Sequence, residues 1–353
     1  MLFAGSHNYS AGQVGGLALE LATWRASFWT LAIISATFTV VAWWTIPYDS
    51  EQTLDCSYTQ KFRQFDVLGA SLAATGIASL TASLTLAGQA SHGWRTPYIA
   101  ALFAAGIIFV AIFLFWESVF TYPLMPLSIW KDRNFTLLVI TLCLCFYGFA
   151  GNLVWLCLLW QRIQHNSPLM VDAKLLPAAI SAVCVNLIVA LTMHRVDNKV
   201  LMAVGTAGFV VSNALLSATS EQISYWALTF PALILITVGA DFQFTVTNVY
   251  VLSCIPTEQQ SVGGGILITM SKVASTIGLG VQTSTFTALG GSSSGPGAIK
   301  YRAYQSTFWV SLAGSVLALM FLPFITVGSQ GARVEKTSDT ISREAQGVED
   351  RTT

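Results

Sequence analysis

Long apolar stretches, separated by short polar ones, make up most of this chain. Each stretch approaches the roughly 20 residues with which an α-helix crosses a hydrocarbon core of about 30 Å. These runs are too long and too evenly apolar for barrel strands, so we expect helices, whose backbone groups are satisfied within the segment. The expected spans are residues 2–22, 27–46, 66–87, 97–117, 135–159, 171–194, 200–218, 225–253, 262–289 and 305–327. The pattern predicts an all-α, polytopic membrane helix bundle of about ten transmembrane helices.

Composition supports this interpretation and excludes several function classes. Charged residues are 10% of the chain and hydrophobic residues 54%, too little polar surface for a soluble protein of 353 residues. The formal net charge of zero argues against a nucleic-acid partner. The cysteines lack metal-ligand spacing with histidines, so we expect no metal and no cofactor. Nucleotide-binding and hydrolase motifs are absent from the sequence, which predicts neither an enzyme nor an ATP-driven pump.

The distribution of lysine and arginine predicts an orientation. With spans alternating in direction, ten of these residues fall on the side of the polar tail at 328–353 and five on the opposite side. Positive residues favour the cytoplasmic side, so we expect a disordered, cytoplasmic tail. We also expect the plasma membrane rather than the vacuolar membrane, and the oligomeric state stays open.

Two ionisable residues lie far from the ends of their spans. Asp241 comes 15 residues before Pro256, and Lys272 comes 16 residues after it. A turn near Pro256 would place both side chains at similar depth on antiparallel helices. Because charges inside a membrane need a partner or water, we expect both to face the interior and to interact. Asp241 could bind and release a proton while Lys272 favours its charged form, or the two could form a static ion pair.

Polar and aromatic residues accompany Asp241 on its helix. Phe244, Thr245 and Asn248 follow it at the spacing of one helical face, which suits a water-accessible substrate cavity. The alternative is that Thr245 and Asn248 only hydrogen-bond to neighbouring helices.

Three more polar residues lie inside other spans. Tyr147 and Asn152 share one helix, and Asn186 lies in the next. They are expected to line the same cavity or to bridge helices.

Several segments carry a resemblance to a known family. They are AGQVGGLALELATWRASFW at 11–29, FDVLGASLAATGIASLTASLTLAGQASHGWRTPYI at 65–99, FWESVFTYPLMPLSIWKDRNF at 115–135, GADFQF at 239–244 and PTEQQSVGGGILITMSKVASTIGLG at 256–280. With these segments the chain resembles the major facilitator superfamily, in its fourteen-helix drug:proton antiporter branch, and more specifically the fungal proteins related to aminotriazole resistance.

The resemblance also marks departures from the family pattern. Ala11 and Gly12 stand where the family's antiporter motif has Gly and Pro, whereas Gly15 and Gly16 match it. The ten expected spans correspond to helices five to fourteen, so the first four helices are lacking and the fold is expected to be partial.

The same resemblance implies an organisation and a function. It implies a remnant of the N-terminal half, two linking helices with their loops, a C-terminal six-helix bundle and the tail, at residues 1–46, 47–134, 135–327 and 328–353. Alternating access around a central cavity implies a secondary active transporter, with proton-coupled efflux of small molecules or drugs. Its partners are then a small-molecule substrate, protons and the bilayer. The alternatives are a truncated, non-transporting membrane paralogue and an uptake carrier for a small solute such as ammonium or borate.

Overall fold

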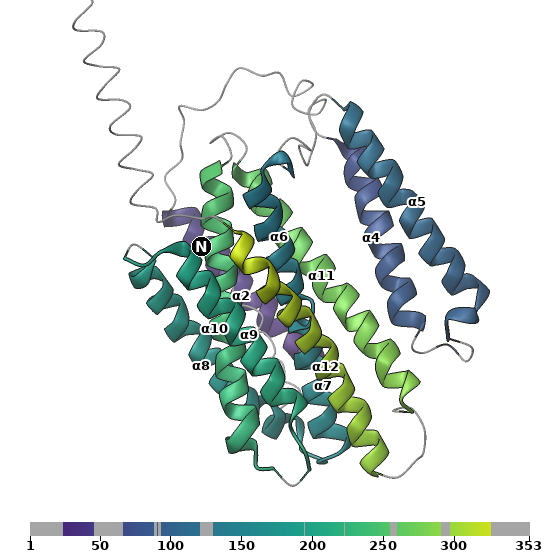
Figure 1. Cartoon of the computed structure of the whole chain (residues 1–353), viewed down its shortest axis with the longest axis vertical. Coiled ribbons are helices and arrows are strands. Elements are labelled where there is room, and N and C mark those ends of the chain that lie inside the picture. The colour runs from purple at the N-terminus through teal and green to yellow at the C-terminus, as the bar shows by residue number, and fades with distance from the viewer. Residues whose placement is uncertain are drawn as a thin grey trace, which may run out of the picture.

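The computed structural model describes residues 24–45, 66–87, 90, 93–120, 130–193, 195–221, 223–254, 260–290 and 297–325 (Figure 1). Within these ranges the regular structure is entirely helical. The α-helices are α2 (Trp24–Thr45), α4 (Val67–Ala87), α5 (Pro97–Val119), α6 (Arg133–Phe146), α7 (Phe149–Arg162), α8 (Pro168–Thr192), α9 (Asn198–Ser217), α10 (Tyr225–Cys254), α11 (Gln260–Ala288) and α12 (Gly297–Phe321). Two short 3-10 helices complete the list: η2 (Gly93–Arg95) lies between α4 and α5, and η5 (Leu322–Phe324) follows α12.

The predicted all-α polytopic bundle is confirmed. Nine helical segments of the described part are long and apolar enough to cross a membrane. The expected span 2–22 and the tail 328–353 lie outside the described residues. Two spans differ from expectation: the span at 135–159 consists of the separate helices α6 and α7, and α12 begins at Gly297 rather than at residue 305.

Local sequence signals explain where several helices begin. The Asp132 carboxylate accepts a hydrogen bond from the Asn134 amide at 2.8 Å and caps α6. The Ser167 hydroxyl accepts one from the Met170 amide at 3.3 Å and caps α8, whose first residue is Pro168. Side chains of this kind satisfy amides that the first helical turn leaves open, and proline suits that turn because it has no amide proton.

The distribution of side chains is that of a membrane protein. Large apolar side chains face outward along whole helices, as on α8, where Ile180, Leu187 and Leu191 are 57–67% exposed. Many polar side chains of the same bundle are buried, including Asn152 and Gln282. Lipid removes the penalty for exposed apolar surface, and buried polar groups then hold helices together through hydrogen bonds.

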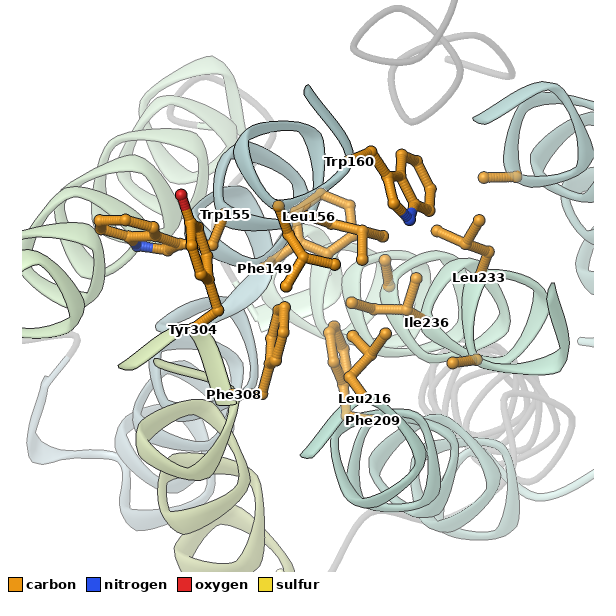
Figure 2. Close-up of a cluster of buried hydrophobic side chains, with 14 of the residues drawn as sticks. Phe149, Trp155, Leu156, Trp160, Phe209, Leu216, Leu233, Ile236, Tyr304 and Phe308 are labelled. Carbon is orange, nitrogen blue, oxygen red and sulfur yellow. The ribbon is translucent and has the colours of Figure 1, made fainter. Parts of the chain in front are cut away.

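The apolar core of the bundle lies where α7, α9, α10 and α12 meet. Phe149, Leu156, Phe209, Ile236 and Phe308 converge there from the four helices (Figure 2). The helices α9 and α10 approach most closely at glycines: a Cβ atom on Gly208 would lie 3.0 Å from the Leu235 carbonyl oxygen. The small residues therefore allow backbone contact between these two helices.

The helices α4 and α5 form a hairpin that contacts the bundle through α11 (Figure 1). Gly280 of α11 lies against Leu84 of α4, where a Cβ atom would come within 2.5 Å. The open end of the hairpin is fastened by the buried Asp66, which accepts hydrogen bonds from the Gly69 amide at 2.7 Å and from Trp116 Nε1 at 3.0 Å. The hairpin is thus a unit beside the bundle rather than part of its core. The division of the chain into domains stays a prediction.

Candidate functional site

Asp241 lies in the middle of α10 and is 6% exposed. The side chain of Asn186 on α8 lies near its carboxyl group. The Asn186 amide nitrogen donates to the Ala182 carbonyl oxygen at 2.9 Å, which fixes the orientation of this side chain. The second carboxylate oxygen of Asp241, Oδ2, is buried and has no hydrogen-bond partner. The site therefore offers one open acceptor atom at the centre of a membrane-spanning helix.

The contact between α8 and α10 places these side chains together. One helical turn earlier, the hydroxyls of Ser181 on α8 and Thr237 on α10 lie 2.8 Å apart and share a hydrogen bond. From the Ser181–Thr237 pair to the Asn186–Asp241 pair the residue numbers increase on both helices, so α8 and α10 run in the same direction. We call the set Ser181, Asn186, Thr237 and Asp241 the α8–α10 polar seam.

The expected pairing of Asp241 with Lys272 is wrong in geometry. Asp241 is buried, whereas Lys272 is exposed, and the two make no ion pair in the described structure. The buried side of α11 passes through Ser271, Ser275 and Gly278, and Lys272 lies about 100° away from Ser271 around the helix. In addition, α10 packs mainly on α8 and α9, whereas α11 packs mainly on α12, α4 and α6. Similar depth on consecutive helices did not make the two side chains neighbours.

The polar and aromatic face that follows Asp241 is partly enclosed. Asn248 is 8% exposed, and Phe244 and Thr245 are half-buried. The Phe244 ring meets the Phe146 ring of α6 edge-on, with centroids 6.3 Å apart. This face of α10 therefore points toward α6, and its role as a substrate cavity stays a prediction.

Asn152 belongs to a buried hydrogen-bond network that joins α7, α9, α11 and α12. Its amide nitrogen donates to Asn213 Oδ1 at 2.7 Å. Its amide oxygen accepts from Ser311 Oγ at 2.6 Å and from Gln282 Nε2 at 3.2 Å. Asn213 in turn donates to Ser315 Oγ at 3.1 Å. This arrangement is the helix-bridging alternative for Asn152, and we call the set Asn152, Asn213, Gln282, Ser311 and Ser315 the four-helix polar network.

Sequence reasoning missed most of this network. A single Asn, Gln or Ser in an apolar helix is a weak signal, because each can turn toward its own backbone or toward a neighbour. The useful signal was the spacing of Thr307, Ser311 and Ser315, which places three small polar residues on one stripe of α12. Tyr147, the other residue predicted on the Asn152 helix, is half-buried at the junction of α6 and α7.

The remaining predictions about sites have different outcomes. The residues Ala11, Gly12, Gly15 and Gly16 of the antiporter-motif remnant lie outside the described residues. Within the described ranges, no group of three or more His, Cys, Asp or Glu residues could hold a metal ion.

The chain is similar to several proteins that are named as transporters. The chain is 24% identical to an uncharacterized MFS-type transporter of Schizosaccharomyces pombe, over 89% of this chain and 60% of the relative. It is 25% identical to the efflux pump terJ of Aspergillus terreus, over 94% of this chain and 63% of the relative. It is 26% identical to a low affinity ammonium transporter of Saccharomyces cerevisiae, over 74% of this chain and 50% of the relative.

These likenesses support membership of the major facilitator superfamily (MFS), although no family model matches the chain. The chain spans 50–63% of the length of these three relatives. The likenesses and the nine apolar helices of the described part support an integral multi-pass membrane protein.

Proposed function

We propose that this chain is a secondary active transporter of the drug:proton antiporter branch, and that Asp241 carries the coupling proton. The observation that carries the proposal is the buried Asp241 carboxyl group in mid-span, which lies near Asn186 and whose Oδ2 has no hydrogen-bond partner. Ionisable residues inside a membrane are costly and are retained mainly where they bind ions, protons or substrates. The proposed direction is efflux across the plasma membrane.

The chemistry of the α8–α10 polar seam suits proton exchange. A carboxyl group can bind and release a proton, whereas the hydroxyls of Ser181 and Thr237 and the amide of Asn186 stay neutral. A proton on Oδ2 removes the net charge of the seam, and its loss restores a negative site inside the membrane. If the binding of a substrate or a conformational change depends on this charge, it also depends on whether the proton is bound.

Movement between α8 and α10 supplies the link to alternating access. The Ser181–Thr237 hydrogen bond crosses the contact between these two helices, and Asn186 lies near Asp241 across the same contact. Protonation turns Oδ2 of Asp241 from a hydrogen-bond acceptor into a donor. The partner that this oxygen prefers, and with it the preferred position of α8 on α10, then depends on the proton. Alternation between two such arrangements exposes the site to one side of the membrane and then to the other.

Flux measurements in proteoliposomes test the proposal. The purified full chain is reconstituted, a pH gradient is imposed, and the movement of ethidium, a fluorescent organic cation, is followed in both directions. We expect ethidium to move against the proton gradient and to stop moving when an ionophore collapses that gradient. The proposal is contradicted if ethidium and several other efflux dyes cross the vesicle membrane equally fast with and without the protein.

Uptake of ammonium is a second candidate, favoured by the likeness to the yeast ammonium transporter. Ammonium is a small cation, and the negative α8–α10 polar seam could attract it. Radiolabelled methylammonium distinguishes the two candidates in the same vesicles. Accumulation of methylammonium without ethidium efflux favours uptake, and flux of neither probe favours the non-transporting paralogue.

A further inference from the structure

The side of α10 that faces away from Asp241 carries a second buried polar group. Gln243 comes two residues after Asp241, so its side chain lies about 200° around the helix from the carboxyl group. This side chain is fully buried, and its Oε1 atom accepts a hydrogen bond from Thr206 Oγ1 of α9 at 3.3 Å. Within the described part of the chain, its Nε2 atom is buried and has no hydrogen-bond partner. Turning the amide over would leave Oε1 open instead, so one end of the amide is open in either orientation.

A second open polar atom lies one helical turn further along α10. Thr247 follows Gln243 by four residues and therefore lies on the same side of the helix. Thr247 is fully buried, and its Oγ1 atom has no hydrogen-bond partner among the described residues. Threonine hydroxyls in helices commonly bond to the carbonyl oxygen of the preceding turn, as Thr206 does to Met202 at 2.9 Å. Gln243 and Thr247 thus present two open polar atoms to one region of the bundle.

The row of α10 residues spaced by four positions locates this region. Gly239 lies against α9, where a Cβ atom would come within 2.9 Å of the Gly205 carbonyl oxygen. At the other end of the row, Val251 belongs to an apolar cluster with residues of α6. Gln243 and Thr247 lie between these two points, so they face the junction where α9 and α6 meet on the surface of α10.

The helix α6 contributes Cys145 to the same junction. This side chain is 1% exposed and lies near the Thr206 hydroxyl. The helix α10 packs more extensively on α9 than on α6, and a ligand on the α6 side, between Cys145 and Thr247, must be small. The amide, the two hydroxyls and the thiol are neutral, and a buried ion without a charged partner is costly. The ligand that suits these groups is therefore small and neutral, and it both donates and accepts hydrogen bonds.

We propose that Gln243 and Thr247 bind one water molecule at the junction of α6, α9 and α10. Because water donates and accepts, it satisfies the Gln243 amide in either orientation and the Thr247 hydroxyl at the same time. The water adds hydrogen bonds beside a contact to which Phe146 of α6 and Phe244 of α10 contribute their rings. The site does not involve Asp241, so this proposal and the proposed proton coupling can fail separately.

Radiolytic footprinting of the full chain in detergent tests for the water. X-rays split bound water into hydroxyl radicals, which oxidise the side chains beside it, and mass spectrometry detects the products. We expect oxidation of Cys145, because thiols react fast with these radicals and this one lies at the site although it is closed to bulk solvent. Phe308 of the apolar core is 1% exposed and should stay unmodified, which reports that the core is intact. An unmodified Cys145 in the wild type overturns the proposal.

Two substitutions and a control show whether the oxidation depends on the site. Thr247→Val keeps the shape of the side chain and removes its hydroxyl, and Gln243→Leu removes the amide. We expect the oxidation rate of Cys145 to fall several-fold in both variants. The control is Ser212→Ala, because Ser212 is a fully buried hydroxyl of α9 that already donates to the Ala232 carbonyl oxygen at 2.7 Å. Equal rates in the wild type and the two variants, or an equal fall in the control, overturn the proposal.

Thermal unfolding in detergent distinguishes a hydroxyl that binds water from one without a partner. With the water, Thr247→Val removes hydrogen bonding and lowers the unfolding temperature. Without it, the substitution removes an unsatisfied polar group and raises that temperature or leaves it unchanged. We expect the lower temperature, and a Thr247→Val protein at least as stable as the wild type contradicts the water site.

Discussion

Replacing Asp241 with asparagine is expected to remove most of the dependence of transport on a pH gradient. The substitution keeps the size of the side chain and a partner for Asn186, but it removes the group that can bind a proton. Coupling between two sites in proteins typically amounts to about 5- to 150-fold. Loss of the coupling should therefore lower the gradient-driven part of the flux by a factor of about that size. Flux driven only by the substrate gradient is expected to persist.

The control is the same chemical change outside the membrane. Asp197 precedes α9, is exposed and makes no side-chain capping hydrogen bond, so Asp197→Asn should leave the pH response intact. Both variants are compared in the proteoliposome assay after their helix content and monodispersity in detergent are matched. An Asp241→Asn protein whose flux still follows the pH gradient as the wild type does excludes Asp241 as the coupling group.

The second large effect is expected on stability, from Asn152→Leu. Asn152 makes three hydrogen bonds to other helices, with Asn213, Gln282 and Ser311. Measured interhelical hydrogen bonds in membranes contribute about 0.6 to 1.7 kcal/mol each, so the loss of three destabilises the bundle by about 2–5 kcal/mol. Gln282 already has an unpartnered oxygen, and the substitution leaves further buried groups without partners.

Thermal unfolding in detergent, followed by size-exclusion chromatography with a fluorescent tag, measures this effect. Val154→Leu is the control, because Val154 lies on the same helix, is 43% exposed and adds apolar surface only toward lipid. The Asn152→Leu protein should lose its monodisperse peak at a lower temperature than wild type, and the Val154→Leu protein should not. Equal unfolding temperatures for Asn152→Leu and wild type contradict a structural role for the network.

The membrane-spanning helices were predictable because lipid imposes a length and a composition on each of them. The windows 66–87 and 225–253 match α4 and α10 to within one residue at each end. The interruption in the window 135–159 was not predicted. The residues that contact it, Ser275, Gly278 and Ser311, lie more than 120 residues away in the sequence.

The candidate site was predictable only in part. A lone carboxyl group in an apolar helix marks Asp241 without knowledge of its neighbours. The assignment of Lys272 as its partner failed because sequence gives the depth of a residue in the membrane but not the order of helices around a bundle. Asn186 on α8 lies near Asp241 instead, and the contact between α8 and α10 follows from tertiary packing that spacing does not reveal.

Infrared difference spectroscopy of the full chain, between mildly alkaline and mildly acidic solution, tests the central claim most directly. A proton that binds to Asp241 produces the C=O band of a protonated carboxylic acid, at a frequency set by its buried surroundings. We predict such a band in the wild type and in Asp197→Asn, and its absence from Asp241→Asn. A spectrum that is the same for wild type and Asp241→Asn contradicts the account, because Asp241 then exchanges no proton.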